Sequence, residues 1–154
     1  MIEEHTGDRA ELRALFALAD DSPSAIARYL EAGSVLVARD DGRVVGHVQL
    51  VPTGDAAVAE IASVAVDPAW QRCGLGARLV RAALERARAT AVQRVRLATA
   101  TADIGNLRFC QRLGFRMVRI EPDAFTPETG YPHDAMIDGI PLRDRVWFEI
   151  LLSP

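Results

Sequence analysis

The sequence predicts an α/β fold in which a single mixed β-sheet carries helices on both faces. Helical and strand patterns alternate along the chain in the order α-α-β-β-β-α-β-α-β-β, and neither an internal repeat nor a linker divides the 154 residues. With 49% hydrophobic residues, a chain of this length is large enough to bury a core. We therefore expect one domain spanning residues 1–154.

The elements follow from the spacing of apolar residues, which recur at helical intervals in helices and alternate or run together in strands. Ser22 and Pro23 fit the N-cap and first position of the second helix, and Gly33 ends it. The Asp-Asp-Gly sequence at 40–42 is typical of a turn between paired strands, and Gly114 fits the C-cap of the last helix. In chain order, the predicted elements are helices over about 8–19 and 22–32, strands at 35–38, 44–51 and 57–66, a helix over about 74–90, a strand at 94–98, a helix over about 104–113, and strands at 115–121 and 145–152.

Composition and charge exclude several classes of function. The formal net charge of -3 and the absence of a basic stripe disfavour nucleic acid as a partner. The acidic start of the chain lacks the basic region of a signal peptide, and no apolar run approaches the ~20 residues of a membrane helix. We therefore expect a cytoplasmic protein without membrane contact. Cys73, Cys110 and the histidines show no metal-ligand spacing, so we expect free thiols and no metal.

The loop at 71–76, Gln-Arg-Cys-Gly-Leu-Gly, is the strongest functional motif. It joins a strand to the N-terminus of a helix, where unpaired N–H groups and the helix dipole favour an anion. Gly74 and Gly76 permit close approach of a pyrophosphate, and Arg72 adds a cation. A Walker loop would require a lysine, which the chain lacks, and the third glycine of the dinucleotide fingerprint would fall on Leu79.

The loop and its surroundings resemble the GNAT (general N-acetyltransferase) superfamily, whose motif Gln/Arg-x-x-Gly-x-Gly/Ala is filled at positions 71–76. The strand and proline at 64–68 look like the splayed strand of the family, and 106–115, ending in Arg-Leu-Gly-Phe, looks like its second motif. The resemblance covers about 34–120 and is that of a small bacterial-type, single-domain member. It implies a mostly antiparallel mixed sheet with a splay at an acetyl-CoA site.

The resemblance also implies which residues hold acetyl-CoA, the expected co-substrate. Backbone amides from Arg72 to Ala77 would bind the pyrophosphate, and Val64 and Val66 would pair with the pantetheine arm like an added strand. The expected cofactor-binding residues are Val64, Ala65, Val66, Gln71, Arg72, Cys73, Gly74, Leu75, Gly76, Ala77, Asn106 and Phe109.

Glu60 is the predicted general base. An amine with a pKa of ~10.4 is almost fully protonated at neutral pH, and using only its free form would cost roughly 4 kcal/mol. Counted by strand alternation, Glu60 shares a face with Val64 and Val66, which is an unusual place for a carboxylate unless it lines a cavity. It also matches the catalytic glutamate in the histone-acetylating branch of the family. The alternative is a glutamate at a strand edge or end, facing water.

Cys110 occupies the position at which many family members carry a tyrosine that protonates the departing CoA thiolate. A thiol can donate this proton, so Cys110 is the candidate general acid, although its side chain is shorter. In the alternative interpretation Cys110 is a small buried apolar residue. Water or Tyr131 then supplies the proton, or turnover is slow.

The acceptor is expected between the first helices and a proline-rich, acidic connection at about 122–141. This connection contains no arginine or lysine, so its acids could receive a cationic amine, unless it is a solvated loop. His47 and Gln49 project from one strand face and either border the acceptor groove or are exposed polar positions. The acids and the interleaved aromatic residues are Glu121, Asp123, Glu128, Asp134, Asp138, Phe125 and Tyr131.

Two functions of different classes fit these features. The first is an N-acetyltransferase that moves an acetyl group from acetyl-CoA to a primary amine of a small molecule or peptide by direct attack in a ternary complex. The second is a non-catalytic acyl-CoA-binding sensor or regulatory module, which the missing tyrosine allows. Acetylation of tRNA-linked amino acids is disfavoured by the acidic balance. The hydrophobic last strand suits either a monomer or a homodimer.

Overall fold

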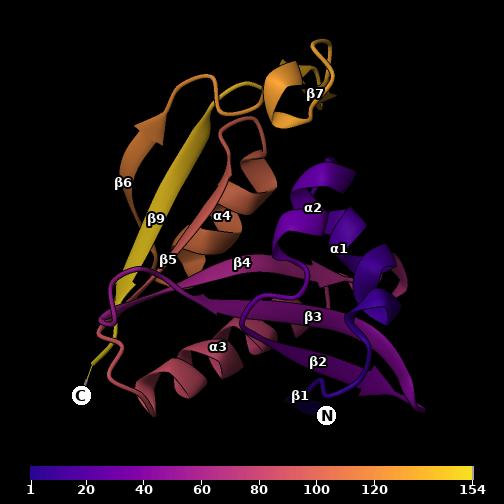
Figure 1. The fold of residues 1–154 in the computed structure, drawn as a ribbon, viewed down its shortest axis with the longest axis vertical. Helices are drawn as coiled ribbons and strands as arrows, with labels where there is room; N and C mark the ends of the chain where they lie inside the picture. Colours follow the sequence, from indigo (N-terminus) through magenta and orange to yellow (C-terminus); the bar gives the residue numbers. More distant parts are fainter. Residues whose placement is uncertain (154) are drawn as a thin grey trace.

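In the computed structural model, residues 1–153 are described and centre on a seven-stranded sheet of order β1-β2-β3-β4-β5-β9-β6 (Figure 1). Neighbouring strands run antiparallel except for β4 and β5, which are parallel, so the sheet is mixed as predicted. Its strands are β1 (Ile2–Glu4), β2 (Ser34–Asp40), β3 (Arg43–Pro52), β4 (Val58–Val66), β5 (Arg94–Ala100), β6 (Arg116–Glu121) and β9 (Arg145–Leu151). A separate hairpin is formed by β7 (Met136–Ile137) and β8 (Ile140–Pro141).

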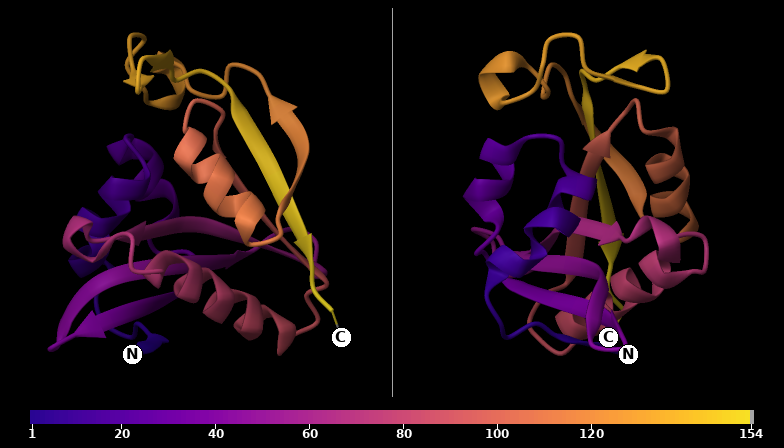
Figure 2. Two further views of the ribbon diagram at one scale, coloured as in Figure 1. Left: turned by 180° about the vertical axis from the view of Figure 1, so that it is seen from behind. Right: turned by 90° about the vertical axis from the view of Figure 1, so that its right-hand side faces the viewer.

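Helices lie on both faces of the sheet, which confirms the second part of the predicted fold class. The first two helices lie on one face, over the N-terminal strands, and the other two lie on the opposite face (Figure 2). The α-helices are α1 (Arg13–Ala19), α2 (Pro23–Tyr29), α3 (Leu75–Arg88) and α4 (Ile104–Arg112). The short 3-10 helices are η1 (Arg9–Leu12), η2 (Pro68–Trp70) and η3 (Pro127–Thr129).

Each face of the sheet has its own apolar core. The larger core buries Leu79 and Val80 of α3 against the sheet and reaches Phe148 of β9. The smaller core packs Phe16 of α1 against Val35 of β2 and draws nothing from α3 or α4. Because α1 and α2 are short, their core stays confined to the N-terminal half of the sheet. The same face of β5, β9 and β6 carries polar side chains instead.

The local signals place the element boundaries largely as expected. The Ser22 side chain accepts a hydrogen bond from the Ala25 amide at 3.1 Å and caps α2, which begins at Pro23. The hairpin turn between β2 and β3 puts Asp41 and Gly42 at φ values of 50° and 81°, which are typical of a two-residue hairpin loop.

Two parts of the architecture were not predicted. Strand β1 pairs with β2 through only three residues, which is too short a segment to show a periodicity. The connection at 122–141 was expected to lack regular structure, but it contains η3 and the β7–β8 hairpin. Asp138 and Gly139 form the turn of this hairpin at φ values of 49° and 81°. A two-residue strand carries no pattern that distinguishes it from a loop.

The central strands separate partway along their length. The parallel pairing of β4 with β5 runs from Val58, opposite Arg94, to Ile61, opposite Leu97, and then stops. Beyond this point β4 keeps only β3 as a neighbour, while the rest of β5 continues to pair with β9. The sheet therefore opens between the ends of β4 and β5, as the resemblance implies.

Two glycines with left-handed backbones give a matched test of this packing. Gly33 joins α2 to β2 at a φ of 56°, and a Cβ added there would lie 2.2 Å from the Leu50 carbonyl oxygen. Gly42 has a φ of 81° with open space around it. We expect Gly42→Ala to cost about 1 kcal/mol of unfolding free energy, because only the backbone is strained. Gly33→Ala should cost about 3 kcal/mol, because a steric clash adds to that strain.

Urea unfolding of the two variants measures this difference directly. Equal losses of stability in both would show that Gly33 and β3 do not approach each other as closely as the structure indicates.

Candidate active site

The candidate site includes the open edge of β4. From residue 62 to residue 66 the backbone has no strand partner on the side of β5. Unpaired backbone N–H and C=O groups at a sheet edge form a template for an extended ligand. The side-chain amide of Gln71 already donates a hydrogen bond of 3.0 Å to the carbonyl oxygen of Val66. This contact fixes the following loop against the end of the open edge.

The loop after β4 is shaped by two left-handed residues. Arg72 has a φ of 66° and Gly74 a φ of 79°, and both are exposed. The first N–H of α3 to find a helical acceptor is that of Arg78, which donates to the Gly74 carbonyl at 3.1 Å. The amides of Leu75, Gly76 and Ala77 precede that first helical bond, as expected at a helix N-terminus. Together with the helix dipole, they form an anion-binding surface.

The space around the two glycines suits a ligand at this loop. A Cβ on Gly74 would meet nothing within 4 Å, so the left-handed backbone, and not a lack of space, favours glycine at this position. The surface in front of Gly74 is open. A Cβ on Gly76 would lie 3.4 Å from the ring of Phe109 in α4. Asn106, also in α4, donates a 3.3 Å hydrogen bond to Thr99 at the end of β5. The predicted residues of α4 therefore lie next to the loop and to the end of β5.

An extra residue in β4 sets the direction of Glu60. Gln49 lies opposite Ser63, but the next residue, Leu50, lies opposite Ile61, so Ala62 bulges out of the β3–β4 ladder. Strand alternation reverses at this bulge. Ile61 and Val64 consequently pack in the same core, on the side of α3. Glu60 lies on the opposite face, and the expectation that it shares a face with Val64 and Val66 is wrong.

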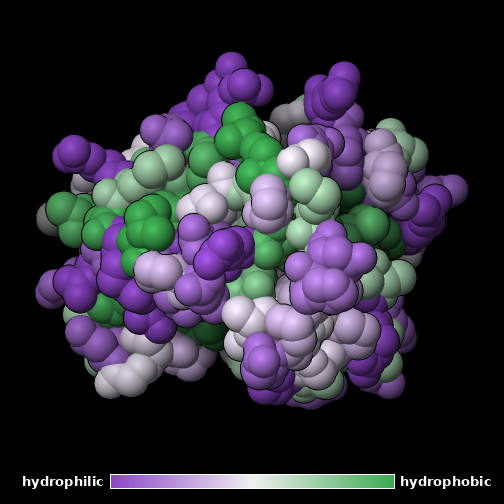
Figure 3. Space-filling model, turned by 90° about the horizontal axis from the view of Figure 1, so that it is seen from above, coloured by the Kyte–Doolittle hydropathy of each residue, from purple (hydrophilic) through white to green (hydrophobic). Residues whose placement is uncertain are grey.

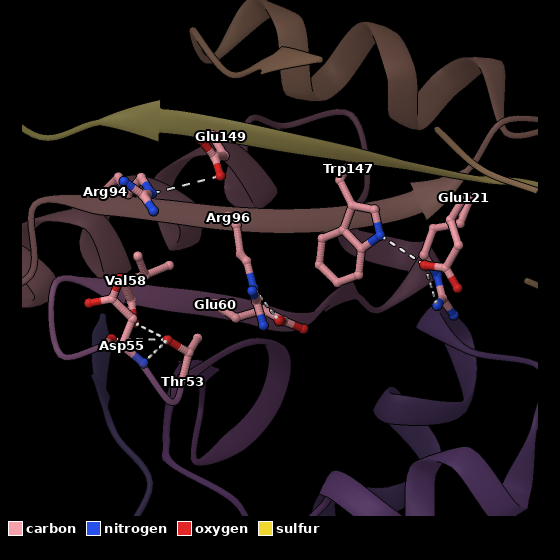
Figure 4. Close-up of polar contacts among 10 residues, drawn as sticks. Thr53, Asp55, Val58, Glu60, Arg94, Arg96, Glu121, Trp147 and Glu149 are labelled. Atoms are coloured by element: carbon pink, nitrogen blue, oxygen red, sulfur yellow. Dashed lines mark hydrogen bonds and ion pairs between the residues drawn. The ribbon is translucent and has the colours of Figure 1, made fainter. Parts of the chain in front are cut away.

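Glu60 points toward β5, where a cation holds it. The Arg96 guanidinium donates from Nε to Glu60 Oε1 at 2.8 Å, and the two residues are register partners in the parallel ladder. The guanidinium carbon of Arg96 also lies 5.2 Å from the ring centre of Trp147 on β9. Glu60, Arg96 and Trp147 therefore form a continuous row across the sheet (Figure 4).

The row continues to the edge strand. Trp147 donates from its indole nitrogen to Glu121 Oε1 at 2.9 Å, and Arg145 approaches the same oxygen at 3.5 Å. The hydrogen bond from Trp147 and the charges of Arg145 and Arg119 lower the pKa of Glu121, against the opposing effect of burial. Glu121 is therefore an ionised carboxylate at neutral pH.

A family model for the acetyltransferase (GNAT) family matches residues 5–115. The chain belongs to this family. The uncharacterized N-acetyltransferase YvbK of Bacillus subtilis (strain 168) is 34% identical over 143 residues, which cover 93% of this chain and 89% of the relative.

Two solved GNAT structures match nearly the whole chain. A GNAT family acetyltransferase from Elizabethkingia anophelis with acetyl-CoA bound has a TM-score of 0.89 and 27% identity, covering 99% of this chain and 97% of its own. A Bacillus subtilis acetyltransferase in complex with CoA has a TM-score of 0.88 and 31% identity, covering 99% and 98%. The present protein is thus a GNAT acetyltransferase, and the bound ligands of these relatives support acetyl-CoA as its co-substrate.

In this acetyltransferase, the predicted general acid lies in the core. Cys110 of α4 is 4% exposed and belongs to the larger apolar cluster. Burial, with a smaller contribution from the charge of Asp103, raises the pKa of the Cys110 thiol to about 12. Such a thiol is a weak acid. Its position matches the alternative of a small buried residue more closely than that of a proton donor.

The connection at 122–141 is anchored to α1 and α2. Tyr131 is buried and donates from its hydroxyl to Asp20 Oδ1 at 2.6 Å, and Tyr29 donates to the other oxygen of Asp20 at 2.9 Å. Burial and the neighbouring carboxylate raise the pKa of both tyrosines. Both hydroxyls therefore stay protonated and engaged with Asp20, which leaves Tyr131 poorly placed to donate a proton elsewhere.

Arginines outside this connection balance part of its acidic charge. Arg143 pairs with Asp123 at 2.8 Å, and Arg145 pairs with Glu121. The end of the molecule that carries η3 and the β7–β8 hairpin shows a mixture of hydrophilic and hydrophobic residues (Figure 3). Because Asp123 and Glu121 are already paired with arginines, the expected cationic acceptor loses part of its support.

His47 and Gln49 are neither exposed nor part of the groove lining. Both are fully buried beneath α1 and α2. The His47 ring stacks on Phe16 at 4.2 Å between centroids and contacts the Ser63 hydroxyl at 2.8 Å. Burial lowers the pKa of His47 to about 3, so the ring stays neutral. The Gln49 amide donates to the carbonyl oxygen of Tyr29 at 2.6 Å and thereby holds the end of α2.

Among residues 1–153, the structure shows no group of three or more His, Cys, Asp or Glu side chains arranged to hold a metal ion. Within the same residues, no helix has the length and apolar character needed to cross a bilayer.

The sequence reasoning missed the residues that surround Trp147. Val146 and Phe148 of the last strand are buried in the larger core. The alternate positions of the same strand carry Arg145, Trp147 and Glu149, and those of β5 carry Arg94 and Arg96. Charged residues alternating with core residues on two strands are the signal that could have revealed a second, polar surface.

The two cysteines of this acetyltransferase give a direct test of the site geometry. Cys73 is exposed in the loop, with its thiol 2.7 Å from the Trp70 carbonyl oxygen, whereas Cys110 is buried. We expect iodoacetamide at pH 8 to alkylate Cys73 and to leave Cys110 unmodified in the folded protein, because a buried thiol of high pKa is rarely a thiolate. Peptide mass spectrometry locates the label.

The denatured protein is the control and should take up label at both cysteines. Alkylation of Cys110 in the folded protein at a rate similar to that of Cys73 would contradict its burial in the core. Protection of Cys73 by added CoA would support the assignment of the loop to the cofactor.

Proposed function

We propose that this acetyltransferase moves an acetyl group from acetyl-CoA to a primary amine by direct attack in a ternary complex, with Glu60 as general base. The observation that carries the proposal is the position of Glu60. It lies one residue before the parallel pairing of β4 and β5 ends, and it faces the polar surface rather than the core of α3. A carboxylate is thus available at the opening of the sheet, where the two substrates would meet.

The residues that would hold acetyl-CoA lie on the other side of the same opening. The amides of Leu75, Gly76 and Ala77, with the Arg72 side chain, would bind the pyrophosphate. The backbone of Val64 and Val66 would pair with the pantetheine arm. When bound, the co-substrate supplies an acetyl group activated as a thioester. The protein contributes position, because two reactants held side by side react far faster than free ones.

Glu60 is suited to accept a proton because only one of its carboxylate oxygens is engaged. Arg96 binds Oε1 and fixes the side chain, which leaves Oε2 for the ammonium group of the acceptor or for a bridging water. Removing the proton before attack recovers much of the roughly 4 kcal/mol that a protonated amine of pKa ~10.4 would otherwise cost.

We further propose that water, rather than Cys110, delivers a proton to the departing thiolate. A free thiol has a pKa of ~8.5, so a thiolate is a tolerable leaving group at neutral pH. Proton transfer from Cys110, with a pKa of about 12, would run uphill. Its buried thiol also belongs to the core rather than to the opening of the sheet.

Glu60→Gln tests the general base. The glutamine oxygen can still accept the hydrogen bond from Arg96, so the local geometry is retained. We expect kcat to fall about 100-fold at pH 7 and to recover in part as pH rises toward the pKa of the amine, because more acceptor is then unprotonated. CoA-thiol release over a panel of amines measures kcat, and calorimetry should show unchanged CoA affinity.

Glu149→Gln is the matched control. Glu149 lies on the same polar surface and pairs with Arg94 at 3.8 Å, but it belongs to β9, which β5 separates from the opening of the sheet. It should retain nearly full activity. CoA binding without thiol release for any amine, together with indifference to Glu60→Gln, would overturn the catalytic proposal and favour the sensor that the missing tyrosine allows.

Cys110→Ala tests the proton donor. We expect kcat to change by less than about threefold, because the thiol is not required as an acid. Truncating this buried side chain should instead lower the unfolding free energy by about 1 kcal/mol. A loss of kcat of more than tenfold in a folded variant would restore Cys110 as the general acid.

A further inference from the structure

Cations gather on the polar surface that faces the proposed acceptor site. The guanidinium carbons of Arg96, Arg119 and Arg145 lie 5.2, 5.4 and 6.0 Å from the ring centre of Trp147. They come from three adjacent strands, β5, β6 and β9. Glu60 and Glu121 provide two carboxylates for these three arginines. Their convergence on one ring is notable in a chain whose formal net charge is -3.

Hydrogen-bond donors of Arg119 and Arg145 remain available at the end of the polar surface that is far from Glu60. Arg96 is paired with Glu60 through its Nε at 2.8 Å. Arg145 reaches Glu121 only at 3.5 Å, and within residues 1–153 Arg119 has no salt bridge and is exposed. A guanidinium has five N–H donors, so Arg119 and Arg145 can bind a further anion in a bidentate manner.

The surface itself is open. Arg96 and Trp147 alternate with core residues of β5 and β9, so their side chains lie on the side of α1 and α2. Those helices pack over the N-terminal strands and leave the β5–β9–β6 part of this face without a helix (Figure 2). The indole of Trp147 lies between the Glu60–Arg96 pair and Glu121 (Figure 4). A small molecule that crosses this ring would meet a base at one end and free cations at the other.

We propose that the acceptor is an amine that also carries a carboxylate, which Arg119 and Arg145 bind while the amine lies at Glu60. This inference rests on the proposed function and replaces the cationic acceptor expected from the acidic connection. Both oxygens of Asp20 already accept hydrogen bonds from the hydroxyls of Tyr29 and Tyr131. The carboxylate offsets the repulsion among the clustered guanidinium groups.

Matched acceptors test the proposal. Glycine, β-alanine, 4-aminobutanoate, 6-aminohexanoate and phenylalanine are each compared with their carboxamides for CoA-thiol release. We expect the acid to exceed its amide about tenfold in kcat/KM for at least one chain length, as one charge-assisted contact allows. In the α-amino series the amide is the less basic amine, so protonation alone would favour the amide. Added salt should reduce the preference.

In the Arg119→Gln variant, the ratio of kcat/KM for the acid to kcat/KM for its amide should fall close to one. Arg143→Gln removes an exposed arginine that pairs with Asp123, away from Trp147, and should leave the ratio unchanged. A ratio at or below one in the unmodified protein, or a preference that survives Arg119→Gln, would overturn the proposal.

Equilibrium binding separates this proposal from the proposed function. Calorimetry with the N-acetylated acids and the N-acetylated amides measures recognition of the carboxylate without turnover. Tighter binding of the acids, lost in Arg119→Gln, supports the anion subsite even if no amine releases thiol, in which case the catalytic proposal alone fails. Equal binding of acids and amides overturns the subsite even if amines are acetylated.

Discussion

The separation of β4 from β5 after Ile61 is the constraint on which the rest of the site depends. Pairing along the full length of both strands would satisfy the backbone of residues 62–66 and close the sheet. The opening instead leaves that backbone edge free, next to the N-terminus of α3. An exposed strand edge can pair with another chain and cause aggregation. Proteins therefore keep such an edge mainly where a ligand or a neighbouring element pairs with it or covers it. In the function that we propose, the free edge and the free helix amides hold one elongated ligand, acetyl-CoA.

The bulge at Ala62 decides which face of the sheet Glu60 occupies. Without it, Glu60 and Val64 would lie on one face and the carboxylate would point into the core of α3. With it, the apolar residues on both sides of the bulge pack in the core, and Glu60 meets Arg96 on the opposite face. In the function that we propose, one inserted residue therefore allows one strand to contact two substrates on two sides of the sheet.

The sequence predicted most of this fold because its local signals agree with one another. The cap at Ser22, the turn at 40–42 and the amphipathic pattern of α3 each lie where the structure has them. The anion-binding geometry of the loop at 71–76 could be predicted because one short segment contains all the residues that form it. The face of Glu60 could not, since alternation assumes an uninterrupted ladder, and nothing in the residues around Ala62 marks a bulge. The arginines around Trp147 come from separate strands and meet only through sheet order.

The 122–141 connection is anchored to α1 and α2 by a contact that is insensitive to pH near neutrality. Asp20 accepts hydrogen bonds from Tyr29 and Tyr131, and burial of the two phenols raises the pKa of both. Neither hydroxyl loses its proton in the physiological range, so the connection stays attached to α1 and α2. Phe125 packs edge-on against Tyr131 and also lies 4.9 Å from the guanidinium of Arg145. The anchored connection thereby limits the freedom of Arg145, so that an acceptor meets a cation already in place.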